Sequence, residues 1–256
     1  MTSFSNLTET QDITPEADVL GGSKFGPLES GVYPNVTIKM AYTKIAPSGA
    51  MAVELLLACE NGHELRQTLW VQSGTAKGQK NFYVTKKGEK RYLPGYEVFA
   101  AIAKLAIGKS AADLTTEEKT IQIWSYDEKK DVPTSVNVVM DLLNQQITLG
   151  LQKQIVDKKI NVAPQGSPAE YKATGETREE NEIRKVFRAA DGMTTTEVAG
   201  GAANAEFIGL WATKNTGKTV DKSDKDAKGP ALAPSGSSQF GAATAADKPT
   251  APVFGG

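Results

Sequence analysis

A short polar segment of the chain, residues 77–91, carries six basic residues and a single acidic one, Glu89. Its formal charge is therefore +5, in a chain whose net charge is −1. The bases are Lys77, Lys80, Lys86, Lys87, Lys90 and Arg91. Clustered lysine and arginine side chains attract phosphate groups and displace the counterions bound to them. The segment is thus suited to binding a polyanion, although the net charge of the whole chain gives no such indication.

Aromatic residues lie among these bases and beside them. They are Trp70, Phe82, Tyr83, Tyr92 and Tyr96. Aromatic rings stack on unpaired nucleobases of any sequence, whereas the bases of a duplex keep their faces covered by their neighbours. Trp124 and Tyr126, followed by Lys129 and Lys130, repeat the pattern more weakly. The combination predicts a surface for a single nucleic-acid strand.

On this hypothesis ten residues form the candidate DNA-binding site. They are Trp70, Lys77, Lys80, Tyr83, Lys86, Lys87, Lys90, Arg91, Tyr92 and Trp124. The composition is equally compatible with a basic, solvated hairpin whose aromatic rings point into the core. Lys39 and Tyr42 belong to a neighbouring strand, where side chains alternate between faces. They cannot share one face without a bulge or bend, so at least one of them lies outside the site.

Two sequences imitate the end of a phosphate-binding loop, Gly108-Lys109-Ser110 and Gly217-Lys218-Thr219. That loop needs a glycine five residues before its Gly-Lys pair. Ala103 and Ala212 occupy those positions. Neither sequence is therefore interpreted as a nucleotide site.

Metal and nucleophile chemistry find little support in the sequence. Cys59 and His63 are the sole residues of their types, so they cannot form a zinc cage of cysteines and histidines. We expect Cys59 in or near the core and His63 in a solvated turn. The carboxylates of residues 177–182 are interpreted as a solvated face rather than a catalytic pair. The sequence predicts no enzyme, no cofactor and no metal.

The composition sets limits on the class of protein. The chain has 256 residues, of which 39% are hydrophobic, enough for one large domain or two small ones. A single cysteine allows no internal disulfide and suits a reducing cytoplasm. The first twenty residues contain no apolar run, so we expect no signal peptide. No stretch approaches 18 consecutive apolar residues, so we expect no membrane span.

Hydrophobic alternation predicts how the chain begins to fold after an acidic arm. The predicted strands cover residues 32–44, 51–58 and 65–71. Asn61-Gly62 between two of them predicts a hairpin with a type I′ turn, because both residues tolerate a positive φ. Three antiparallel strands in a meander are therefore expected.

The later elements follow the polar segment 74–91. Apolar residues at helical spacing predict a helix over 96–107 that ends at Gly108. Further strands are predicted over 121–126, 135–139, 147–156 and 183–187, a helix over 196–199 capped by Thr194 or Thr195, and another over 205–214. Three strands, a helix and more strands are the order of an OB fold, a small five-stranded barrel. The periodicity does not exclude other small barrels.

The predicted fold is therefore mainly β, an OB-like barrel with short helices and disordered termini. Residues 1–30 form the flexible acidic arm, 31–216 the OB-like domain with a C-terminal helical extension, and 217–256 a tail rich in glycine, alanine and proline. The tail holds too few apolar residues to offset the entropy of ordering it. We expect it to tether partner proteins, with Phe254 as an apolar anchor, or simply to aid solubility.

Four segments spread over roughly residues 1–220 carry a family resemblance. They are Ser5–Thr10, Leu28–Tyr33, the stretch from Asn81-Phe82-Tyr83 through Arg91–Gly95, and Lys172–Phe187, which includes Thr174–Ile183. Together they resemble phage-encoded single-stranded DNA-binding proteins. The resemblance implies an OB-fold core, cooperative coating of replication intermediates in the infected host cell, and a tail that binds replication or recombination proteins. Many such proteins end in an acidic tip, whereas residues 217–256 hold five lysines and four aspartates.

Two functions follow as hypotheses. The first is a sequence-tolerant single-stranded DNA-binding protein that protects strands during phage replication or recombination. The second is a structural or assembly protein of a phage particle, with a β-domain and a flexible tail. A nuclease would need a metal-ligand or nucleophile constellation that the sequence does not offer.

Overall fold

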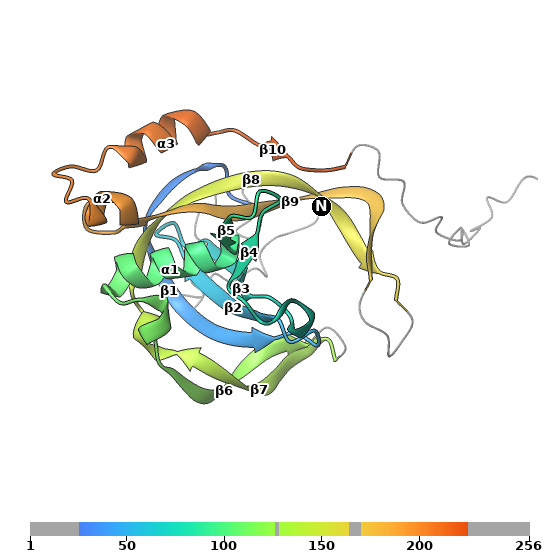
Figure 1. Cartoon of the computed structure of the whole chain (residues 1–256). Helices are drawn as coiled ribbons and strands as arrows, with labels where there is room; N and C mark the ends of the chain where they lie inside the picture. Colours follow the sequence, from blue (N-terminus) through green and yellow to red (C-terminus); the bar gives the residue numbers. More distant parts are fainter. Residues whose placement is uncertain (1–25, 126–127, 164–169, 225–256) are drawn as a thin grey trace, which may run out of the picture.

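The computed structural model describes residues 26–125, 128–163 and 170–224 (Figure 1). Within them the chain is mainly β, as predicted, with an eight-stranded sheet, a separate two-stranded sheet and three short α-helices. None of the described helices is long and apolar enough to cross a membrane. The disorder predicted for the two ends concerns mostly residues outside the described ranges.

The predicted meander opens the fold. Its strands are β1 (Gly31–Ile45), β2 (Met51–Ala58) and β3 (Glu64–Gln72). They pair antiparallel in chain order. Alternate residues point into the core, such as Val53, Leu55 and Leu57 on β2, which are almost completely buried. This one-sided burial explains why the alternation was readable in the sequence.

The hairpin between β2 and β3 differs in detail from the prediction. Three residues, rather than two, connect Cys59 and His63, whose backbones bond at 2.9 Å. Only Gly62 has a positive φ, of 78°, so the predicted type I′ turn is wrong and the loop is of the three-residue kind. His63 is buried rather than solvated, because it lies at the base of the hairpin opposite Cys59. Cys59 is buried, as predicted.

Helix α1 (Pro94–Ile107) follows and packs against β3 and β9. Proline at the first helical position suits its fixed φ, and Gly108, with φ of 74°, ends the helix as predicted. Its buried side chains include Phe99, Ile102 and Leu105, which join the core of the sheet. The helix begins two residues earlier than the apolar pattern indicated.

The second half of the sheet consists of long strands. They are β6 (Thr116–Ser125), β7 (Lys130–Val139), β8 (Gln146–Asn161) and β9 (Tyr171–Arg188). Strand β1 pairs with β8 along its first half and meets β7 at Tyr42. Each strand is longer than its predicted counterpart. The distal half of β8–β9 and most of β6–β7 are two-stranded ribbons, where hydrophobic alternation is weak because neither face is deeply buried.

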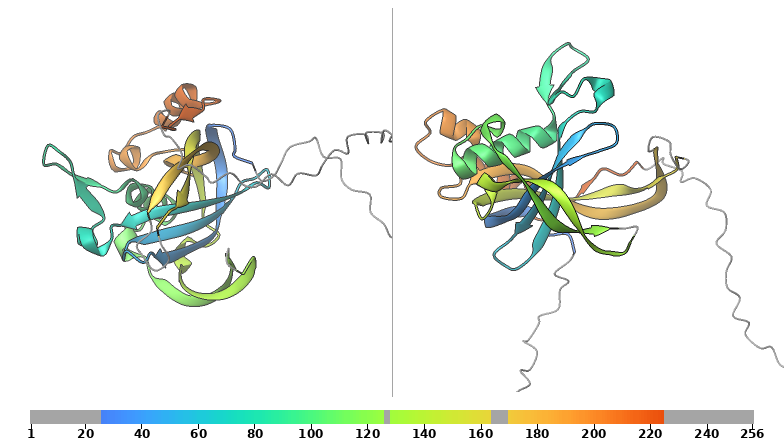
Figure 2. Two further views of the ribbon diagram at one scale, coloured as in Figure 1. Left: turned by 90° about the vertical axis from the view of Figure 1, so that its right-hand side faces the viewer. Right: turned by 90° about the horizontal axis from the view of Figure 1, so that it is seen from below.

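The shorter elements complete the described chain. They are η1 (Thr75–Lys77), β4 (Phe82–Val84), β5 (Lys90–Tyr92), η2 (Ala111–Asp113), η3 (Met140–Leu142), α2 (Thr195–Ala199), α3 (Phe207–Asn215) and β10 (Val220–Asp221). Strands β4 and β5 form a separate hairpin, which projects from the body in both views of Figure 2. Helices α2 and α3 correspond to the two predicted C-terminal helices.

The main sheet is not closed into a barrel. The described strands pair in the order β9, β8, β1, β2, β3, and no backbone pairing joins β3 to β9. Instead, the side-chain nitrogen Nε2 of Gln67 on β3 donates to the backbone carbonyl oxygen of Asn181 on β9 at 3.0 Å. The predicted barrel is thus not closed by strand pairing. A helix follows the three-stranded meander, as in an OB fold, but strands β4 and β5 come between the meander and that helix.

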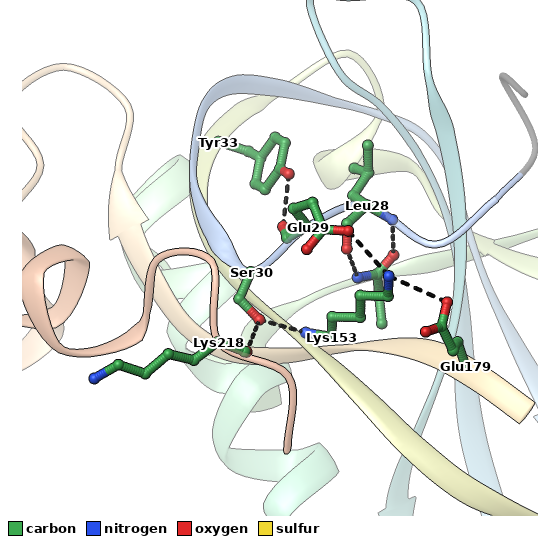
Figure 3. A network of polar contacts seen from close by, with 8 residues as sticks. Leu28, Glu29, Ser30, Tyr33, Lys153, Glu179 and Lys218 are labelled. Atoms are coloured by element: carbon green, nitrogen blue, oxygen red, sulfur yellow. Dashed lines mark hydrogen bonds and ion pairs between the residues drawn. The ribbon is translucent and has the colours of Figure 1, made fainter. Parts of the chain in front are cut away.

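Asn181 also fixes the segment that precedes β1. Its side-chain amide donates to the Leu28 carbonyl and accepts from the Leu28 nitrogen, both at 2.7 Å. Two residues later, Ser30 Oγ accepts from the Lys153 nitrogen at 2.7 Å and donates to the Lys218 carbonyl at 2.6 Å (Figure 3). Lys153 Nζ forms ion pairs with Glu29 and Glu179.

Residues 217–224 were predicted to be part of the tail, but in the structure they lie along the sheet. Strand β10 runs parallel to β8, with Val220 opposite Gln154. Lys222 continues the contact, because its nitrogen donates to the Ile155 carbonyl at 2.8 Å. The apolar content of this segment is low, so its attachment comes from backbone hydrogen bonds that a hydrophobic pattern does not reveal.

Helices α2 and α3 are held by one carboxylate. Thr194 caps α2 in a reciprocal capping box with Glu197, as one of the two predicted alternatives had it. Glu197 also accepts from the backbone nitrogens of Glu206 and Phe207, both at 2.9 Å. These hydrogen bonds, foremost the one from Phe207, lower the pKa of Glu197 from 4.5 to about 2. The carboxylate thereby ties the start of α3 to α2.

We predict that Asn181→Ala destabilises the fold by about 1–3 kcal/mol, because the variant loses two hydrogen bonds worth about 0.5–1.5 kcal/mol each. The free energy of unfolding in urea measures the effect. Asn137→Ala, which alters an exposed asparagine on β7, is the matched control and should change little. An equal effect of both substitutions would contradict the role given to Asn181.

Candidate nucleic-acid interface

The polar segment between β3 and α1 folds into a hairpin with a basic tip. Thr85 and Glu89 close its loop, where the Thr85 nitrogen donates to the Glu89 carbonyl at 2.8 Å. Gly88, with φ of 83°, supplies the left-handed residue that a three-residue loop needs. Lys86 and Lys87 occupy the rest of the loop and are exposed. The two strands are only three residues long, so the hairpin is short and its tip is solvated.

The base of the hairpin is fixed to the meander by backbone hydrogen bonds. The Ser73 nitrogen donates to the Lys80 carbonyl at 2.8 Å, and the Leu93 nitrogen donates to the Asn81 carbonyl at 2.8 Å. Thr75, at the start of η1, donates to the Ser48 carbonyl at 2.9 Å and so joins the loop between β1 and β2. These bonds hold the hairpin against the end of β3.

A cleft of about 680 Å³ lies between β3 and this hairpin. The side chains that bear on binding are Trp70, Lys77, Lys80, Phe82, Tyr83 and Val84. Four of the ten predicted site residues therefore share one cleft, namely Trp70, Lys77, Lys80 and Tyr83. Lys86 and Lys87 stand at the tip of the hairpin, beyond the lining of the cleft.

The predicted aromatic residues are exposed. Trp70 is 46% exposed, Tyr83 45%, Tyr92 53% and Trp124 44%. The alternative in which the aromatics of the basic segment point into the core is therefore wrong for these four. Their rings are accessible to a stacking partner, which is the property that single-strand binding requires.

Few acids neutralise the bases of the hairpin. Arg91 pairs with Glu89 at 3.0 Å. The ammonium groups of Lys80 and Lys90 lie 5.7 and 5.2 Å from the centroid of the Phe82 ring, within cation–π range. Within the described residues, Lys77, Lys86 and Lys87 have no ion-pair partner. Most of the positive charge of this segment is thus free to meet an anion.

Two predicted residues lie elsewhere. Tyr92 contacts Tyr96 of α1, with ring centroids 5.0 Å apart, and borders a different groove. Trp124 lies on β6, in a ribbon that pairs with β1 and not with the hairpin. The sequence grouped these aromatics by proximity along the chain, whereas the fold separates them.

Sequence reasoning missed the residues that continue the surface from Trp70. Arg66 and Thr68 share the exposed face of β3 with Trp70, because side chains two apart in a strand point the same way. A hollow of about 230 Å³, lined by Arg66, Tyr42 and β6 residues including Ile121, lies on this face. Counting back from Trp70 in steps of two would have found Arg66.

Strand β1 contains the kind of irregularity that would allow Lys39 and Tyr42 to share one face. The register of β1 shifts between Ile38 and Met40, so Lys39 lies at an irregularity of the strand. Tyr42 lines the hollow, and Lys39 does not. Burial is the main cause that raises the pKa of the Tyr42 hydroxyl, with a further contribution from Glu54.

Gly95 sets the position of Trp70. A Cβ added at Gly95 would lie 2.5 Å from the Trp70 carbonyl oxygen and 2.6 Å from its nitrogen. Real Cβ atoms do not approach backbone atoms so closely. The first turn of α1 therefore rests directly on the backbone of β3 at this residue, and only glycine permits the approach.

Comparison of the chain with protein-family models, with curated proteins and with solved structures finds no significant match. Membership of the phage single-stranded DNA-binding proteins therefore stays a prediction. Among the described residues, no group of three or more histidine, cysteine, aspartate or glutamate side chains is placed to hold a metal ion.

We predict that Gly95→Ala moves Trp70 and lowers the melting temperature, because a methyl group must displace the backbone of β3. The indole N–H resonance of Trp70 in a ¹H–¹⁵N spectrum measures the movement. Gly209→Ala is the matched control, since it also lies in a helix but its Cβ would meet no atom within 4 Å. That substitution should stabilise α3 by up to about 1 kcal/mol. An unmoved Trp70 resonance in Gly95→Ala would contradict the close contact.

Proposed function

We propose that the chain is a sequence-tolerant single-stranded DNA-binding protein. One observation carries the proposal. Trp70 and Tyr83 present exposed rings to a cleft whose lysines, Lys77 and Lys80, have no acidic partner among the described residues. Stacking on bases and neutralisation of phosphates use both properties, the accessible rings and the unpaired positive charge.

Single strands suit this cleft better than duplexes. Stacking needs a free base face, which a duplex offers only at its ends. Stacking also explains why binding would tolerate any DNA sequence, because every base has a π-face. The exposed face of the second and third strands is where OB folds bind oligonucleotides. Trp70, Thr68 and Arg66 lie on the corresponding face of β3.

A role in coating and protecting single strands during phage replication or recombination extends this proposal. It is supported by the resemblance of the four sequence segments. The basic and aromatic segment 81–95 is one of the four that carry this resemblance, and it also contributes residues to the cleft.

The direct experiment is a gel shift of a labelled oligothymidylate by the full chain in the presence of EDTA. A shifted, undegraded strand is expected, and an unlabelled duplex should compete poorly. A strand that stays unshifted at micromolar protein would overturn the proposal. Degradation of the strand would favour an enzyme instead.

We predict that Trp70→Ala weakens binding to oligothymidylate by about 1–3 kcal/mol, the usual contribution of one stacked base. The free energy of unfolding should change far less than the ~3–5 kcal/mol expected of a buried aromatic, because the ring is half exposed. Binding is measured by anisotropy and stability by urea titration. Trp124→Ala, an equally exposed tryptophan outside the cleft, is the control and should bind normally. Equal losses in both variants would contradict the assignment to the cleft.

We predict a slope of about −3 to −4 for log K against log salt, if four to six bases contact phosphates at about −0.7 each. Replacing Lys77, Lys86 and Lys87 with alanine should flatten the slope by about 2. The control replaces Lys119, Lys130 and Lys172, which are paired with acids on the two ribbons, and should leave the slope nearly unchanged. A slope near zero in the wild type would refute the electrostatic part of the proposal.

A further inference from the structure

A second groove borders Tyr92 on β5, the second strand of the β4–β5 hairpin. Its volume is about 540 Å³. The side chains that matter are Tyr92 on β5, Tyr96 on α1, Arg184 and Lys185 on β9, and Thr195 and Thr196 on α2. The groove thus joins elements far apart in the sequence, and it shares no lining residue with the Trp70 cleft.

The chemistry of this groove repeats that of the cleft. Tyr92 is more than half exposed, and its ring lies 5.0 Å from that of Tyr96. Arg184 and Lys185 supply positive charge, and Glu97 is the one acid that lines the groove among the described residues. Arg184 is exposed and pairs with Glu182 at 3.3 Å, a weak surface contact that a phosphate can replace.

The groove is not closed at its far end. Arg184 and Lys185 also line an adjoining hollow of about 370 Å³ between β9 and α3. There the Lys185 ammonium lies 5.1 Å from the centroid of the Phe207 ring, which is itself exposed, and Lys214 adds a third base. A basic strip with accessible aromatic rings therefore runs from the hairpin along β9 to α3.

The hairpin joins the two sides through its tip. Lys86 and Lys87 lie at the tip of this hairpin, which contributes Tyr83 to the cleft and Tyr92 to the groove, and in the described chain neither lysine has an ion-pair partner. Strands of three residues span about 10 Å, so a backbone that crosses the tip travels a short distance. Basic side chains mark the cleft, the tip and the groove, namely Lys77, Lys86 with Lys87, and Arg184.

We propose that a single DNA strand straddles the hairpin. It occupies the Trp70 cleft, crosses the tip at Lys86 and Lys87, and continues into the groove between α1 and β9. Tyr92 and Tyr96 stack on bases there, and Arg184 and Lys185 bind phosphates. This inference rests on the proposed function and assigns the length and path of its binding site.

The test is a series of oligothymidylates from about 4 to about 20 nucleotides, which covers the usual range for OB-type sites. The full chain is compared with the double variant Arg184→Ala/Lys185→Ala, with anisotropy as the readout. The inference expects the variant to match the wild type on the shortest strands that bind. Its affinity should stop rising at a shorter length and be about tenfold weaker on the longest strand.

The control variant is Arg178→Ala/Lys158→Ala. It likewise removes one arginine and one lysine, but from the β8–β9 ribbon, where both side chains are exposed and paired with acids. It should behave as the wild type. Melting temperatures check that both variants fold.

The outcomes separate the two proposals. If Arg184→Ala/Lys185→Ala reaches its maximum affinity at the same length as the wild type, the straddling path is wrong while the Trp70 cleft stands. An equal effect of the control variant also overturns the path, because it indicates general charge. If the wild type binds no strand in the series, the proposed function itself fails.

Discussion

The edges that β3 and β9 leave unpaired set the arrangement of the molecule. Backbone donors and acceptors at a sheet edge must be covered or solvated, and the core must be sealed where the barrel does not close. Helix α1 lies across this opening and buries Phe99, Ile102 and Leu105 there. Asn181 spans the remaining gap by bonding to Gln67 and to Leu28. The candidate site depends on the same placement of α1, because Gly95 in its first turn rests on the backbone of Trp70, and the hairpin leads directly into this helix.

Charge is segregated in a chain that is nearly neutral overall. The acids of the region 176–182 pair with neighbouring bases, as in Lys158–Glu176 at 2.9 Å and Lys222–Glu182 at 2.8 Å. Such exposed pairs add little to stability, but they neutralise the β8–β9 ribbon. Segment 77–91 has only one acid for its six bases. The net charge of −1 therefore conceals one strongly basic surface.

The sequence predicts well those parts in which each element buries one face. The meander and α1 are of this kind, and their apolar periods of two and 3.6 follow from the position of the core. The β6–β7 and β8–β9 ribbons bury neither face deeply at their ends. The sequence there shows no hydrophobic alternation, so the full length of these strands could not be predicted. His63 was misplaced because its burial depends on the geometry of one turn.

The candidate site was predictable in its composition but not in its grouping. Bases and aromatics between residues 77 and 92 could be recognised, and the exposure of Trp70 and Tyr83 agrees with their predicted role. Hairpin strands of three residues are too short for a period to be detected. The sequence therefore could not show that Tyr83 lines the cleft while Tyr92 borders a different groove. Arg184 and Lys185 come from β9, and no local pattern connects them with the hairpin.

Ser30 has a consequence for how the domain can be connected to other polypeptides. It bonds to the Lys153 nitrogen and to the Lys218 carbonyl, so segments near the first and the last described residues meet at one strand, β8. Domains with adjoining ends tolerate circular permutation and insertion into loops of a host protein. This body therefore has the geometry of a cassette, whose basic hairpin would keep its shape when both ends are fused to the same carrier.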